Sequence, residues 1–279
     1  MDRDRNYPNL TQAIVLILIY FGLALLLGVL IGILSTVLGI SLEKEPGVTA
    51  VINLIIFTIL LVIGYRKTGA SFSEVFPLSP IRPVLLLPMA IMVVGMSILL
   101  SEMDNLFRLF LPAPEWLIKM MKNIVAGKTN FWRSFALIVV IAPLTEEPLF
   151  RGLILRGFLK HYSKTKAILV TAILFAIIHL NPWQFLGALL LGLIFGWWFV
   201  QTRSLIPCLF GHAVANAFPL IISATVEIPG YTIGLDTFQP LWFDILGLIL
   251  VAIGGWLLIL AFQETDNATP EGPSDEGVP

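Results

Sequence analysis

The chain has 279 residues, of which 57% are hydrophobic and 13% charged, and its formal net charge is −1. Soluble domains carry roughly a quarter charged residues, so a water-soluble fold of this length would leave too much apolar surface exposed. The composition therefore predicts an integral membrane protein with the lipid bilayer as its main partner. The near-neutral charge and the lack of a basic stripe argue against a nucleic-acid partner, and the single cysteine, Cys208, excludes an intrachain disulfide.

Apolar stretches long enough to cross a bilayer recur along the chain. Arg3 and Arg5 precede the first of them, which runs from about residue 13 to residue 40. This is longer than the apolar core of a cleaved signal peptide, so we expect a retained span. We predict an all-α fold with about eight spans, or six or seven if a segment is re-entrant or interfacial. The spans are expected near 13–38, 48–64, 83–101, 134–156, 165–181, 183–201, 204–225 and 241–262.

Residues 1–262 are expected to form a single polytopic membrane domain, without an internal repeat, whose motif-bearing core covers 134–225. Residues 72–83 carry three prolines and predict an interfacial turn. Residues 102–133 are amphipathic and predict a helix in the interface plane, either as a lid over a lateral opening or as a surface connector. The tail, 263–279, is acidic and rich in Gly and Pro, which predicts disorder.

The orientation follows from the distribution of Lys and Arg. Eight spans with both termini on one side would place eleven Lys and Arg residues on that side and six on the other. We therefore expect both termini to be cytoplasmic.

Ionisable residues inside spans are costly and call for an explanation. The fourth predicted span contains Glu146, Glu147 and Arg151. Glu147 and Arg151 stand four residues apart on one helical face, where they can pair. Glu146 is rotated by roughly 100° from Glu147 and has no partner within its own segment.

Polar residues also occur in the fifth and seventh predicted spans, which contain His179 and the His212–Asn216 step. A single histidine in a helix is most often a packing residue, but two histidines, an asparagine and an unpaired glutamate at membrane depth are harder to explain by packing. Together these residue types can supply a general base, its orienting partner and donors to an oxyanion. Glu146, His179 and His212 would equally form the two-His, one-carboxylate ligand set of a catalytic zinc site.

Two observations argue against zinc. The His-Glu-x-x-His helix typical of zinc proteases is absent. Each ligating histidine would also need an acceptor for its second nitrogen, and no carboxylate is spare once Glu147 is paired with Arg151, although backbone carbonyls could serve.

The three motifs, Glu146-Glu147-x-x-x-Arg151, Phe175-x-x-x-His179 and His212-x-x-x-Asn216, resemble in this order the signature of the CAAX-protease and bacteriocin-processing (CPBP) family. This family includes the Ras-converting endopeptidase and glutamic intramembrane proteases. The resemblance extends from Ala136 to Phe218.

The resemblance implies a bundle of about eight transmembrane helices around a polar, water-accessible cavity, and a metal-free mechanism without a cofactor. Glu146 and His179 would activate water, and His212 and Asn216 would stabilise the oxyanion. Glu147 and Arg151 would form a supporting ion pair.

The leading interpretation is an intramembrane endopeptidase that hydrolyses a peptide bond of a membrane-associated substrate. Its substrate would be a prenylated C-terminal tail, a leader-type peptide or a transmembrane protein, and the sequence leaves these open. Three alternatives remain: a non-proteolytic membrane scaffold or regulator on the same fold, a zinc-dependent membrane protease, and an ion-coupled transporter. The lack of inverted repeats argues against the transporter.

Overall fold

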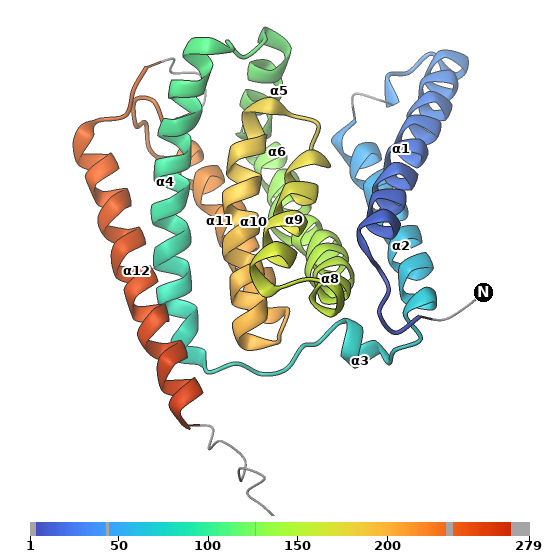
Figure 1. Ribbon diagram of the computed structural model, residues 1–279. Helices are drawn as coiled ribbons and strands as arrows, with labels where there is room; N and C mark the ends of the chain where they lie inside the picture. Colours follow the sequence, from blue (N-terminus) through green and yellow to red (C-terminus); the bar gives the residue numbers. More distant parts are fainter. Residues whose placement is uncertain (1–3, 43–44, 126, 233–236, 269–279) are drawn as a thin grey trace, which may run out of the picture.

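The structure is a computed structural model that describes residues 4–42, 45–125, 127–232 and 237–268. These residues form helices and connecting segments, with no strand among them, which confirms the predicted all-α class. Figure 1 shows a bundle with α1 and α2 on one side, α4 and α12 on the other, and α8 to α11 between them. The helices before the motif core are α1 (Leu10–Leu38), α2 (Pro46–Thr68), α3 (Phe72–Val75), η2 (Pro83–Leu85), α4 (Leu86–Phe110), α5 (Glu115–Val125) and α6 (Gly127–Ser134).

The motif core begins with one long helix in which α-helical and π-helical segments alternate; we call it the composite helix. It continues from α6 through η3 (Phe135–Ile141), α7 (Ala142–Glu147), η4 (Pro148–Leu155) and α8 (Arg156–His161), where η3 and η4 are π-helical. Pro143 and Pro148 lack the N–H groups that a regular helix would use, so carbonyls of the preceding turns lose their usual donors. Three long helices and one shorter one complete the bundle: α9 (Lys164–Ile177), α10 (Pro182–Thr202), α11 (Ile206–Thr225) and α12 (Leu241–Ala268).

Six helices in the described part of the chain are long and apolar enough to cross a membrane, namely α1, α2, α4, α10, α11 and α12. The protein is therefore an integral, multi-pass membrane protein. The predicted spans 134–156 and 165–181 correspond to the composite helix and to α9, and their crossing stays a prediction. Many large apolar side chains of α1 and α12 face outward, as expected where the surrounding solvent is lipid.

Helices α4 and α12 pack along each other through glycine, because backbones without side chains can approach closely within a membrane. A Cβ atom added to Gly95 would lie 2.6 Å from the Gly247 carbonyl oxygen, and one added to Gly254 would lie 2.6 Å from the Met92 nitrogen. Any side chain at these positions would therefore separate the two helices.

The segment before α1 fixes the α1–α2 pair to the rest of the bundle at one end. Asn9 and Gln12 form a reciprocal capping box that starts α1. The Asp4 N–H donates to the Lys67 carbonyl at the end of α2, and His161 contacts the Asn6 carbonyl at 2.7 Å. This end of the molecule thus brings the chain start, α2 and α8 together.

Several predicted boundaries differ from the observed ones, and three of these differences affect the interpretation. Helix α4 runs to Phe110 rather than residue 101, because charges beyond residue 101 are compensated: Asp104 pairs with Arg108 at 2.6 Å, and Glu102 accepts a hydrogen bond from Asn105. Helix α12 continues past residue 262 to Ala268, and the rest of the predicted disordered tail, 269–279, lies outside the described residues. Helix α9 ends at Ile177, so His179 is not helical as predicted.

The described chain ends, near Asp4 and Ala268, lie at the same end of the bundle (Figure 1), as the predicted topology requires. One residue used to orient the chain was misplaced: Arg151 is fully buried and paired with Glu147, so it belongs to neither surface. Ten basic residues against six remain, and the cytoplasmic placement of the termini stays a prediction.

Cysteine labelling should detect this orientation. Two exposed positions are each replaced by cysteine in a Cys208→Ala variant. Thr165→Cys lies next to the Ser163 cap of α9, and Asn123→Cys lies in α5. We expect an impermeant reagent added to intact cells to label position 123 and not position 165. The opposite pattern would reverse the topology.

Candidate active site

The centre of the motif core is a buried ion pair whose carboxylate also contacts a histidine. Glu147 and Arg151 are both 0% exposed, and Arg151 Nη1 donates to Glu147 Oε1 at 2.9 Å, which confirms the predicted pairing. The same carboxylate oxygen lies 2.7 Å from Nδ1 of His212, which reaches it from α11. The carboxylate therefore links two helices, a contact that the sequence did not predict.

Aromatic rings enclose this centre and keep Arg151 away from lipid and water. Its guanidinium lies 4.6 Å from the ring centre of Phe175 and 5.4 Å from that of Phe195, and it donates to the Gly192 carbonyl at 3.3 Å. Both rings offer a π face to the cation, which compensates part of its lost hydration. Phe195 also stacks on the His212 imidazole with a ring separation of 5.9 Å.

The orientation of His212 follows from these contacts. An ionised carboxylate only accepts hydrogen bonds, so the proton on Nδ1 points to Glu147. Nε2 is then the free ring nitrogen, and it lies 3.9 Å from Glu146 Oε2. This distance is too long for a direct hydrogen bond, but one water about 2.8 Å from each atom would bridge them.

Glu146 is positioned differently from its neighbour. Its side chain is 16% exposed, and its buried Oε2 accepts no hydrogen bond from the described residues. The Tyr20 hydroxyl of α1 contacts Asn53 Oδ1 of α2 at 3.3 Å. Helix α2 packs against α7, which carries Glu146, so it contributes to the surroundings of this carboxylate although its sequence contains no recognisable motif.

His179 lies in the turn between α9 and α10. Leu180 has a left-handed backbone (φ 47°), and Pro182 holds Asn181 out of helical geometry, so the chain leaves the helix here. His179 Nδ1 lies 2.8 Å from the Phe175 carbonyl, and because a carbonyl only accepts, this nitrogen must donate. Nε2 of His179 is left free to act as an acceptor.

His179 and Glu146 do not form a direct ion-pair contact, although the family resemblance implies that they activate water together. Among the described residues, no ion-pair contact within 4.0 Å joins them, whereas His212 makes one to Glu146. Phe175 lies between the two histidines, with its ring centre 5.1 Å from His179 and 5.9 Å from His212. The roles of these residues stay predictions.

Asn216 donates a hydrogen bond to a backbone carbonyl of the composite helix that lacks its usual N–H partner. Its Nδ2 donates to the Ile138 carbonyl at 2.8 Å. In the π-helical segment η3 this carbonyl would bond to the nitrogen of residue 143, which is a proline and has no N–H. One of the two amide N–H bonds of Asn216 is thus used structurally, and the other is available to a ligand.

Close helix packing brings these residues together. A Cβ atom at Gly211 would lie 2.4 Å from the Trp198 ring and 2.9 Å from the Phe195 ring, so only glycine lets α11 place His212 against Phe195. The cavity expected around the motif residues stays a prediction. Two cavities among the described residues are lined by residues outside the motifs. One lies near α1 and α2, and the other near α3, α8 and α10.

The structure changes one argument about zinc. Glu147 accepts from His212 while it is paired with Arg151, so the expectation that no carboxylate is spare is wrong, and a backbone carbonyl accepts from His179, the alternative that the sequence allowed. Separately, no three His, Cys, Asp or Glu side chains in the described part of the chain are arranged to hold a metal ion.

Six apolar helices and a buried polar centre inside the bundle define a multi-pass membrane protein whose candidate site lies between its helices. Residues 128–218, which contain all three motifs, match the family described as type II CAAX prenyl endopeptidase Rce1-like. The resemblance to the CPBP family is therefore confirmed over this segment, and it indicates a membrane-embedded CAAX-type protease that acts on peptide substrates. No curated protein and no solved structure gives a significant match to the chain.

Proposed function

We propose that the protein is a glutamic intramembrane endopeptidase that hydrolyses a peptide bond with water activated by Glu146. The observation that carries this proposal is the difference between the two adjacent carboxylates. Glu147 is fully buried and bound by Arg151 and His212, while Glu146 is partly exposed and has a buried oxygen without a partner among the described residues. Glu147 is therefore committed to structure, and Glu146 is available to accept a proton.

In the proposed reaction a water molecule held by Glu146 attacks the carbonyl carbon, and its proton moves to the Glu146 carboxylate. The carbonyl oxygen becomes an oxyanion, which Nε2 of His212, when it carries a proton, and the second N–H of Asn216 would stabilise. His179, with a free Nε2, would accept a hydrogen bond from the water and orient it. The tetrahedral intermediate then collapses, the C–N bond breaks, and Glu146 returns the proton to the leaving amine.

The experiment that tests this proposal compares membrane-associated peptides from cells with the wild-type protein and with the Glu146→Gln variant. We expect one or more C-terminal or juxtamembrane fragments to depend on the wild-type protein and to disappear with the variant. A prenylated, a leader-type and a transmembrane substrate would be told apart by the fragment itself. A phenotype that persists with Glu146→Gln, without any protein-dependent cleavage, would favour the scaffold interpretation.

Metal removal is expected to leave activity unchanged. The proposed water is activated by a carboxylate alone, so exhaustive dialysis against a chelator should preserve the rate of cleavage. Elemental analysis should find far less than one zinc ion per chain. Stoichiometric zinc, with activity lost on chelation and restored by added zinc, would instead make Glu146 a ligand.

A further inference from the structure

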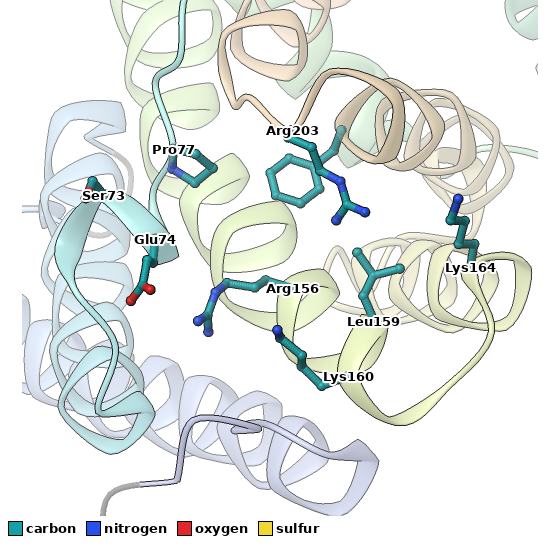
Figure 2. Close-up of a pocket in the computed structure, with 9 residues that line it drawn as sticks. Ser73, Glu74, Pro77, Arg156, Leu159, Lys160, Lys164 and Arg203 are labelled. Atoms are coloured by element: carbon teal, nitrogen blue, oxygen red, sulfur yellow. The ribbon is translucent and has the colours of Figure 1, made fainter. Parts of the chain in front are cut away.

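A cavity of about 390 Å³ lies at the end of the bundle where α3, α8, the start of α9 and the end of α10 meet. Figure 2 shows its lining: Arg156 and Lys160 extend on the side facing Glu74, and Arg203 and Lys164 lie on the other side. Pro77, Leu159 and Phe199 add apolar surface. None of the motif residues lines this cavity.

The cavity is strongly basic, with four cationic side chains and one carboxylate. None of the four cations forms an ion pair within 4.0 Å with a carboxylate of the described residues. Glu74 is engaged with its own helix cap: the Ser71 N–H donates to Glu74 Oε2 at 2.8 Å. The hydrogen bonds from the Ser71 N–H and hydroxyl lower the pKa of Glu74, with a smaller contribution from the charges of Arg5 and Arg156.

Two of the basic residues have unfavourable features. Arg156 has a buried donor that a bound anion would satisfy, and Arg203 has an unfavourable backbone conformation. Nη1 of Arg156 is buried and has no hydrogen-bond partner among the described residues, and leaving a buried charged donor unpaired is costly. Arg203 ends α10 with a left-handed backbone (φ 52°), at a position where glycine or asparagine is more favourable. Backbone geometry therefore does not explain an arginine there, whereas its side chain in the cavity does.

We propose that this cavity binds a phosphate group, presented by the headgroup of an anionic phospholipid. Different oxygens of the phosphate would accept hydrogen bonds from Arg156 and Arg203, the two bases with planar, multi-donor groups, while Lys160 and Lys164 would balance the remaining charge. The cavity lies at the end of α10, which is long and apolar enough to cross a membrane, so it is placed where headgroups of the bilayer are expected. Basic pockets at the ends of such helices are suited to anionic headgroups. Phe199 and Leu159 would contact the apolar part of the lipid.

The test measures binding of defined lipids to the full-length protein in a neutral detergent. Phosphatidylglycerol, phosphatidylcholine and inorganic phosphate are titrated separately, with the thermal midpoint and native mass spectrometry as readouts. We expect phosphatidylglycerol to bind and raise the midpoint, and phosphatidylcholine to do neither. Stabilisation by inorganic phosphate that equals or exceeds that by phosphatidylglycerol would overturn the lipid assignment.

Arg203→Asn is the decisive variant, because asparagine tolerates the left-handed backbone while the substitution removes the guanidinium group. We expect at least a tenfold loss of phosphatidylglycerol affinity without a loss of intrinsic stability. Lys160→Gln, at an exposed position, provides a second removal of charge, and Lys122→Gln in α5 is the matched control away from the cavity. Unchanged affinity in both cavity variants, or equal loss in the control, would overturn the proposal.

Discussion

Replacing Glu146 by glutamine should reduce the rate of peptide cleavage by about 10²–10⁴-fold, the usual contribution of a general base. Glutamine keeps the shape of the side chain but cannot take a proton from water. The fold should be unaffected, because Glu146 Oε2 accepts no hydrogen bond from the described residues whose loss would cost stability. Cleavage by the purified variant and its thermal unfolding curve measure the two effects separately.

The control for this variant is Glu115→Gln, which neutralises an exposed carboxylate of α5 whose ion-pair partner among the described residues is Lys119. It should leave both activity and stability close to wild type, since exposed ion pairs contribute little. Glu146→Gln cleaving at the wild-type rate would show that another group activates the water.

Glu147→Ala should instead destabilise the protein by about 3–5 kcal/mol, the cost of leaving one partner of a buried ion pair uncompensated. Both Arg151 and His212 lose their acceptor, and the aromatic rings around Arg151 provide no anion in its place. Activity should fall as well, because the His212 ring loses the hydrogen bond that orients it. Thermal unfolding in detergent is the measurement for stability.

The double variant Glu147→Ala, Arg151→Leu separates the charge effect from the rest. Removing the stranded cation should recover part of the lost stability, and the two substitutions should be strongly non-additive. Recovery should remain incomplete, because His212 Nδ1 still lacks its acceptor. If the double variant is no more stable than Glu147→Ala, the ion pair does not contribute as the structure indicates.

The sequence correctly predicted the contact between two site residues that lie close together in the chain. Glu147 and Arg151 lie one helical turn apart, so their spacing alone places them on one face. The contact between Glu147 and His212 joins residues 65 positions apart. It depends on how α11 packs against the composite helix, including the absence of a side chain at Gly211, and no periodicity in a single sequence encodes that distance.

Errors in the predicted elements have physical causes that the sequence partly displayed. The span containing His179 was extended by its apolar residues, although Pro182 disfavours helix in the residue before it. The span ending at residue 101 was cut short by charges, but Asp104 and Arg108 neutralise each other within the helix. Apolar length alone correctly located the six long helices, because that is the property the bilayer requires.

The position of the Glu147–Arg151 pair within one helix also bears on the biogenesis of the protein. A helix is released into the bilayer before the segments that follow it in the chain have been synthesised, and each charge at its centre costs roughly 2.5–3.5 kcal/mol. Because its two members lie four residues apart, the pair forms as soon as the composite helix does. We therefore expect His212, 65 residues later in the chain, to contact a carboxylate whose charge Arg151 already balances. On this expectation the polar centre assembles in two stages, and its two full charges need no partner from a later helix.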